Sequence, residues 1–164
     1  MQRISIISAM SENHVIGIHN SLPWQLPGDW ENFRRVTAGK AFLMGRKSYE
    51  AADALHSEYR NVIISRQPGL QLGPNTEQGV SIEAGMALLA GEPDFFILGG
   101  AEIFRQTLHL ANYFYRTLVH AVVEGDAFFP EVDWSQWELV STARHEADAR
   151  HAYAFSLEEW RRVV

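Results

Sequence analysis

The segment Leu22-Pro23-Trp24-Gln25-Leu26-Pro27-Gly28-Asp29-Trp30 is the centre around which we organise the chain, and it combines two prolines, two tryptophans and two leucines with a single carboxylate. Pro27 disfavours a helical conformation at the residue before it, and Gly28 permits a turn. A helix can therefore begin near Asp29, and we predict that it ends near Gly39. The segment marks the entrance to the first helix of the chain.

Asp29 is a carboxylate on an otherwise apolar face of that helix. Phe33 follows four residues later and Val36 three beyond it, so the three side chains share one face. One interpretation is a solvated acid in the first helical turn, which the helix dipole favours. The other is a functional acid, because Trp24, Trp30 and Phe33 would desolvate the carboxylate and shift its pKa. The apolar neighbourhood favours the functional interpretation.

The length and composition are those of one globular domain. The chain has 164 residues, 46% hydrophobic and 21% charged, and we predict a single domain over residues 1–164. The formal net charge of −6 argues against a nucleic-acid partner. There is no cysteine, which excludes disulfides, zinc–thiolate sites and thiol nucleophiles. Residues 1–10 are too short for a membrane span and lack a signal-peptide cleavage region, so we expect no membrane partner and a cytoplasmic location.

Strand-like and helix-like segments alternate along the first part of the chain. After residue 110 the strand-like segments follow one another without helices, so we expect those strands to be antiparallel. The pattern predicts an α/β domain with a mostly parallel sheet and an antiparallel C-terminal edge. The predicted strands are 3–10, 41–44, 61–65, 95–98, 113–123, 137–144 and 152–160. The predicted helices are 29–39, one that follows 45–48 and ends near 55, 82–90 and 101–108.

Two stretches are predicted to be irregular. Residues 11–21 form a long connection between the first strand and the first helix. Loops of this length inside a compact domain are usually functional, and many of them are lids. The polar stretch that reaches Gly79 contains glycine and proline and is predicted to be a loop.

Three of the predicted strands end in residues suited to binding phosphate groups. Gly45-Arg46-Lys47-Ser48 joins a turn to two cations and a hydroxyl, Ser65-Arg66 offers a hydroxyl and a guanidinium, and Gly99-Gly100-Ala101 lets backbone amides approach an anion. Each motif alone is more often a simple turn. Because the carboxyl ends of parallel strands meet at one edge, we predict that the three cluster in a ligand site. The chain has no Rossmann glycine fingerprint and no Walker loop.

Other chemical motifs are weak. The seven histidines include no H-E-x-x-H, and no G-x-S-x-G is present. His145, Glu146, Asp148 and His151 lie close in sequence, and we interpret them as a solvated hairpin rather than a metal site. We therefore predict no bound metal.

Taken together, these residues resemble the dihydrofolate reductases. The matching segments occur in the order of that family and span nearly the whole chain. The most specific are the opening segment with Asp29 and the Met-Gly-Arg sequence. The segments are Val15–Gly17, Leu22–Pro27 with Asp29, Met44–Arg46, Asn61–Ser65, Leu98–Ala101, Thr117, Glu124–Asp126 and Phe129–Pro130.

The resemblance implies an eight-stranded central sheet flanked by about four helices, with NADPH as the hydride donor and 7,8-dihydrofolate as the acceptor. It places the product, tetrahydrofolate, in one-carbon metabolism, and it implies antifolate inhibitors as further ligands and a monomeric protein. Residues 13–24 would form a lid, here called the lid segment, against which Asp126 packs. The Gly99–Gly100 peptide bond would be cis.

The resemblance also assigns roles to residues, with Asp29 anchoring the pterin and a proton arriving through water held near Asp29 and Trp24. The implied catalytic residues are Asp29, Trp24, Leu22 and Thr117, which bridges to the carboxylate. The implied substrate-binding residues are Ile7, Ser8, Ala9, Trp30, Phe33, Arg34, Ala52, Tyr59, Arg60, Leu98 and Phe104. The implied cofactor-binding residues are Ala9, Ile16, Gly17, Asn20, Ser21, Gly45, Arg46, Lys47, Ser48, Ser65, Arg66, Gly99, Gly100, Ala101, Glu102, Ile103 and Gln106.

The chain departs from the family at the position that grips the substrate's glutamate tail. Tyr59 stands where an arginine is usual, and Arg60 or Arg34 would be a less constrained substitute. Phe104 and Ala52 also replace a tyrosine and a larger aliphatic residue. These departures leave two alternatives open. One is a reductase of a tail-less dihydropterin or pyrimidine on the same fold, and the other is a non-catalytic NADP-binding module.

Overall fold

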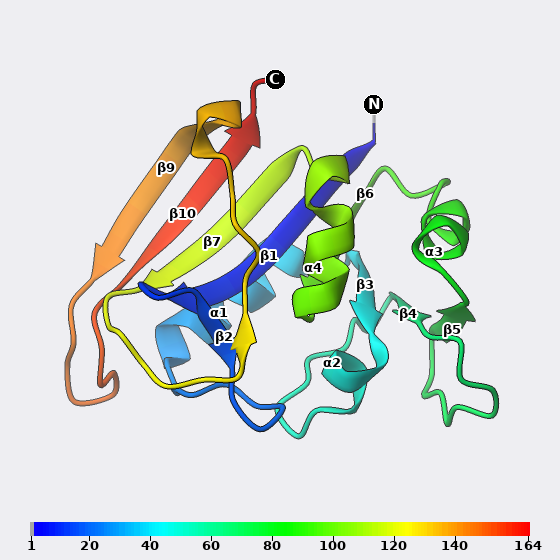
Figure 1. Cartoon of the computed structure of the whole chain (residues 1–164), viewed down its shortest axis with the longest axis horizontal. Coiled ribbons are helices and arrows are strands. Elements are labelled where there is room, and N and C mark those ends of the chain that lie inside the picture. The colour runs from blue at the N-terminus through cyan, green and yellow to red at the C-terminus, as the bar shows by residue number, and fades with distance from the viewer. Residues whose placement is uncertain (1) are drawn as a thin grey trace.

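A computed structural model describes residues 2–164 of the chain, which form one mixed α/β domain (Figure 1). The central sheet has eight strands in the order β5-β4-β3-β6-β1-β7-β10-β9, which confirms the predicted architecture. Its strands are β1 (Arg3–Ser11), β3 (Ala41–Gly45), β4 (Arg60–Ile64), β5 (Thr76–Gly79), β6 (Asp94–Gly99), β7 (Tyr113–Val119), β9 (Trp137–His145) and β10 (Phe155–Arg162).

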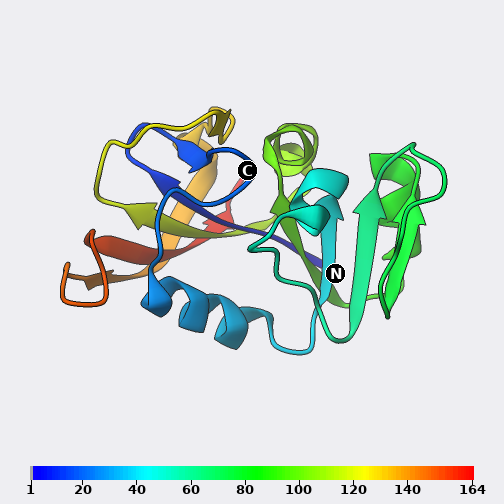
Figure 2. The same cartoon turned by 90° about the horizontal axis from the view of Figure 1, so that it is seen from below.

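The helices cover both faces of this sheet. Figure 2 shows α1 on one face and α4 on the other. Among residues 2–164, no helix is both long and apolar enough to span a lipid bilayer. The helices are α1 (Pro27–Thr37), α2 (Arg46–Glu50), α3 (Ile82–Leu88) and α4 (Ala101–Thr107), with 3-10 turns η1 (Leu108–Leu110) and η2 (Trp134–Gln136).

Alternation along the central strands builds two cores, one on each face of the sheet. Ile6 of β1 packs in the cluster that includes Phe104 of α4. Its neighbour Ile7 packs in a second cluster, against which Phe33 and Val36 of α1 are placed. Successive residues of a strand point to opposite faces, so a strand that is apolar throughout serves both layers.

The three C-terminal strands form the antiparallel edge that the sequence predicts. Strand β7 is antiparallel to β10 and parallel to β1, with Ser5 opposite Tyr113. The first of the three strands, predicted at 113–123, ends at Val119. Helix α4 provides the crossover between β6 and β7, which keeps the strand direction. Only the pairs β7–β10 and β10–β9 form the antiparallel edge.

Several element ends differ from their predicted positions. Helix α1 begins at Pro27 rather than near Asp29, because proline is well suited to the first position of a helix. Helix α2 ends at Glu50 and does not reach residue 55. Part of the stretch predicted to be a polar loop is strand β5, Thr76–Gly79, which is polar because it lies at the edge of the sheet.

Part of the lid segment is a strand. Strand β2 (Val15–Gly17) pairs with β8 (Ala127–Phe128) in a separate two-stranded sheet. Asp126 makes two hydrogen bonds to the lid segment. Its amide donates to Gly17 O, and its Oδ2 accepts from the amide of His19, both at 3.0 Å. The predicted packing of Asp126 against the lid segment is therefore present.

Candidate active site

A cavity of about 230 Å³ opens between α1 and the carboxyl-terminal parts of β1 and β6. Seventeen of the site residues predicted from the sequence line this cavity, and they come from segments far apart in the chain. The nominated residues that line it are Ile7, Ser8, Ala9, Ile16, Gly17, Asn20, Ser21, Leu22, Asp29, Trp30, Phe33, Ser48, Leu98, Gly100, Ala101, Phe104 and Thr117.

Asp29 lies in the first turn of α1 and faces this cavity. Its Oδ1 accepts a hydrogen bond of 2.6 Å from the hydroxyl of Thr117, a residue of β7 that is 88 positions away. Burial raises the pKa of Asp29 from 3.8 to about 6, and the hydrogen bond from Thr117 opposes that rise. The site therefore presents a carboxyl group that gains or loses a proton close to neutral pH.

The helix that carries Asp29 is held at its start by a distant side chain. Leu26, the N-cap of α1, makes no side-chain cap hydrogen bond. Instead the amide of Gly28 donates to Nε2 of His151 at 2.9 Å. His151 is 3% exposed, so the hairpin predicted to be solvated is buried at this residue. The hairpin between β9 and β10 thus supplies the missing cap.

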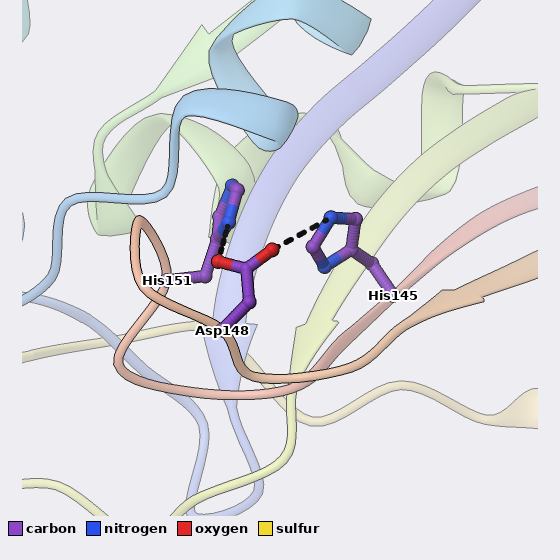
Figure 3. Close-up of side chains that lie close together, drawn as sticks. All are labelled: His145, Asp148 and His151. Carbon is purple, nitrogen blue, oxygen red and sulfur yellow. Dashed lines mark hydrogen bonds and ion pairs between the residues drawn. The ribbon is translucent and has the colours of Figure 1, made fainter.

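His151 belongs to a cluster with His145 and Asp148, whose side chains converge in Figure 3. Because Nε2 of His151 accepts from Gly28, its Nδ1 carries the proton and donates to Asp148 Oδ1 at 2.8 Å. Nδ1 of His145 donates to the carbonyl of Glu146 at 2.7 Å. Both nitrogens of His151 are thus engaged, which leaves too few lone pairs for a metal in this arrangement.

Trp24 lies behind the cavity rather than on its surface. Its side chain is 5% exposed and packs with Leu26, Val119 and Phe155, with Leu22 against the same cluster. Its indole Nε1 is buried without a hydrogen-bond partner among the described residues. A buried donor of this kind is available to a water molecule or a ligand.

The three predicted phosphate-binding motifs lie side by side, because the strands before them are parallel neighbours in the sheet. Gly45 of β3 is opposite Ile64, the residue before Ser65-Arg66, and Met44 is opposite Gly99. The Gly99–Gly100 peptide bond is cis, and Gly99 has φ +103°. A Cβ atom on Gly99 would lie 2.7 Å from the Phe104 ring, so this position requires glycine.

The polar side chains around these motifs differ in their availability. Arg46 pairs with Glu50 at 3.1 Å, whereas Lys47 and Arg66 are exposed. Ser65 Oγ accepts from the amide of Gln67 at 3.1 Å. On α4, Ile103 is buried, while Glu102 binds Arg105 and Gln106 on the exposed face. The nominated residues that do not line the Asp29 cavity are Trp24, Arg34, Gly45, Arg46, Lys47, Ala52, Tyr59, Arg60, Ser65, Arg66, Gly99, Glu102, Ile103 and Gln106.

Tyr59 and Arg60 are not brought to the cavity, contrary to their nomination as substrate-binding residues. The hydroxyl of Tyr59 donates to Glu92 Oε2 at 2.9 Å, and Arg60 binds Glu92 at 3.0 Å and Glu77 at 2.6 Å. Arg60 is the first residue of β4, at the amino edge of the sheet, whereas the cavity opens toward the carboxyl edge. Ala52 does not line the cavity either, and its side chain is exposed.

Several lining residues were missed by the sequence reasoning. One of them is Asp53, which lies beside Ala51, Ala54 and Leu55 in the segment after α2. The available signal was an acid within a short alanine-rich stretch, one residue from the nominated Ala52. Ala127 was also missed. Met44 and Asp126 belong to the matching segments described above but were not predicted to line the site.

Comparisons with known proteins agree on one family. The family model described as dihydrofolate reductase matches residues 3–162. The dihydrofolate reductase of Neisseria meningitidis serogroup A is 40% identical over 157 residues, which cover 94% of this chain and 96% of that protein. The dihydrofolate reductase of Bacillus subtilis is 33% identical over 93% of this chain and 90% of its own length. A solved structure of dihydrofolate reductase from Enterococcus faecalis, complexed with NADP(H) and RAB-propyl, superposes with TM-score 0.88 at 31% identity, covering 99% of this chain and 97% of that one.

Proposed function

Because the chain belongs to the dihydrofolate reductase family, we propose that Asp29 and the cavity around it bind the pterin of dihydrofolate and promote its protonation. The protein is an NADPH-dependent oxidoreductase that reduces dihydrofolate. The observation that carries the assignment of Asp29 is its hydrogen bond from Thr117 inside an otherwise largely apolar cavity. A carboxylate there can accept two hydrogen bonds from donors on one edge of a pterin ring.

The residues at the strand ends fit NADPH, whose bound nicotinamide supplies the hydride. Gly100 lines the cavity and has no side chain, so its backbone is open to close approach by a ligand. Arg46, Lys47, Ser65 and Arg66 would hold the phosphates of the adenosine half. Arg66 is the candidate for the 2′-phosphate, because guanidinium groups suit phosphate oxygens.

The remaining task of the protein is to orient two flat rings and to control water. Phe33, Leu98 and Phe104 provide apolar walls for this purpose. With a pKa of about 6, Asp29 is mostly ionised at neutral pH, and its negative charge favours a proton on the pterin that it contacts. The buried Nε1 of Trp24 is a donor that can hold a water molecule for proton delivery.

The identity of the preferred pterin is a separate proposal. Tyr59 and Arg60 face Glu92, which weakens the case for a strong grip on a glutamate tail. A tail-less dihydropterin is therefore a second candidate substrate, on that specific observation. The Asp29–Thr117 pair disfavours a non-catalytic NADP-binding module, because binding the cofactor alone does not require it.

We further propose that the enzyme is a cytoplasmic monomer that serves one-carbon metabolism and binds antifolate inhibitors. NADPH is a cofactor of the cell interior. A largely apolar cavity that contains the Asp29 carboxylate also suits flat, basic inhibitors.

The test is the oxidation of NADPH followed by absorbance, with dihydrofolate as substrate and Asp29→Asn as the variant. Losing a charge-assisted contact costs roughly 1.5–3 kcal/mol, so we expect a loss of about 10- to 150-fold in kcat/KM at neutral pH. NADPH binding should remain, and the residual activity should rise at lower pH, where substrate is already protonated. A variant within about threefold of wild type would place the chemistry elsewhere.

A further inference from the structure

One carboxylate ties the segment after α2 to the lid segment. Oδ2 of Asp53 accepts a hydrogen bond from the amide of Leu22 at 2.9 Å and another from the hydroxyl of Ser21 at 3.0 Å. The partners are 31 and 32 positions away from it in the chain. Because Leu22 also lines the Asp29 cavity, this bridge fixes one wall of the site.

Asp53 lies where two hollows meet. Ser21, Leu22, Trp30 and Asp53 line both the Asp29 cavity and a neighbouring groove on the outer side of α1. A substituent that extends from the cavity toward this groove must therefore pass the carboxylate of Asp53.

No cation faces Asp53 from within the cavity. Among residues 2–164, its lining includes the acids Asp29, Asp53 and Asp126 and no lysine or arginine. The groove is lined by two arginines: Arg150 is paired with Glu31 at 3.5 Å, and Arg34 belongs to α1. An anionic group that leaves the cavity here meets a fixed negative charge, with no fixed positive charge in the cavity wall to offset it.

We propose that Asp53 determines the substrate specificity of this enzyme at the mouth of the cavity. Its carboxylate, held by Ser21 and Leu22, disfavours pterins with an anionic tail relative to pterins with a neutral or absent tail. The proposal rests on the proposed function, because it concerns which pterin the Asp29 cavity accepts. At a partly solvated mouth, a like charge at a distance of several ångströms corresponds to about a 3- to 10-fold effect on KM.

Two substitutions separate the charge of Asp53 from its hydrogen bonds. Asp53→Asn keeps an oxygen that can accept from Leu22 and Ser21 but removes the charge. Asp53→Ala removes both. Glu83→Gln is the matched control, because it makes the same change in net charge at an exposed residue of α3, outside the cavity lining.

The experiment measures steady-state NADPH oxidation with dihydrofolate and with a 6-alkyl dihydropterin that has no tail. We expect Asp53→Asn to lower KM for dihydrofolate by about 3- to 10-fold and to leave KM for the dihydropterin within about twofold. Glu83→Gln should change neither of these two KM values. Raising the salt concentration should lower KM for dihydrofolate in wild type and have little effect in Asp53→Asn. Asp53→Ala should raise KM or lower kcat for both substrates, because it also releases the lid segment.

Equal changes for the two substrates in Asp53→Asn, or no change for either, would overturn the proposal. If wild type oxidises NADPH with neither substrate, the proposed function fails instead. In that case the role of Asp53 is tested by measuring the dissociation constants of the two pterins. Quenching of tryptophan fluorescence reports their binding, since Trp30 lines the cavity. A dissociation-constant ratio that Asp53→Asn leaves unchanged would overturn the proposal in that case as well.

Discussion

Nε2 of His151 accepts the backbone amide of Gly28 at 2.9 Å, across 123 positions of sequence. Gly28 immediately precedes Asp29, so the hairpin near the end of the chain fixes the start of the helix that carries the site carboxylate. A helix N-terminus needs acceptors for its first amides, and Leu26 offers no side-chain acceptor here. The Asp29 site therefore depends on a residue that has no chemical role in it.

The first prediction concerns this cap. His151→Ala should lower the free energy of unfolding by about 1–3 kcal/mol, because it leaves a partly buried amide without an acceptor. Urea unfolding at neutral pH measures the change. His151→Gln should recover part of the loss through its amide oxygen, and the exposed His109→Ala should have little effect. Unaltered stability in His151→Ala would show that the Gly28 amide does not depend on this acceptor.

The second prediction concerns metal binding at His145, Asp148 and His151. Added Zn²⁺ should not raise the melting temperature of wild type, because the nitrogens of His151 are already bound to Gly28 and Asp148. A thermal-shift titration with zinc, using His145→Ala as the control, measures this. A zinc-dependent rise in wild type that disappears in His145→Ala would contradict the hydrogen-bond assignment.

These contacts show where sequence reasoning succeeds and where it stops. Asp29 and Phe33 could be placed on one helical face because their spacing is local, and the strand-end glycines could be grouped because parallel strands share an edge. The contacts of Asp53 with Leu22 and of His151 with Gly28 join distant segments through single hydrogen bonds, which no local periodicity encodes. Tyr59 was predicted to bind substrate only because it occupies the position of the family's tail-binding arginine. Its hydroxyl is instead hydrogen-bonded to Glu92, away from the cavity.

The third prediction concerns the choice of cofactor. Arg66→Ala should reduce the preference for NADPH over NADH, chiefly through KM for NADPH. Arg46 is already paired with Glu50, whereas Arg66 is exposed beside the strand ends. A lost guanidinium–phosphate contact corresponds to roughly 1.5–3 kcal/mol. Steady-state kinetics with both cofactors measure it, with Arg35→Ala on α1 as the control. Equal use of both cofactors by wild type would remove the basis for this assignment.

The fourth prediction concerns the position of the usual tail-binding arginine. Tyr59→Arg should leave the affinities for methotrexate, which has a glutamate tail, and for trimethoprim, which has none, both within about twofold of wild type. Glu92 lies 2.9 Å from the Tyr59 hydroxyl and would pair with the new guanidinium. Inhibition constants for the two compounds measure this. Selective tightening of methotrexate would return the tail site to Tyr59.

The last prediction links the pKa of Asp29 to stability. Below pH 3.8 the carboxyl group is protonated in both the folded and the unfolded chain, so it contributes no pH dependence there. Between pH 3.8 and about 6 the unfolded chain ionises while the folded protein holds the proton, so stability falls as pH rises. Above about pH 6 the penalty is complete, and a shift of this size corresponds to at most roughly 3 kcal/mol.

Asp29→Asn keeps an acceptor for Thr117 but cannot ionise, so it should be more stable than wild type at pH 8 and equal to it near pH 3.5. Urea unfolding across this range, without ligands, measures the difference, and Glu83→Gln at an exposed site is the control. A gap between Asp29→Asn and wild type that does not change with pH would show that burial does not set the proton affinity of Asp29.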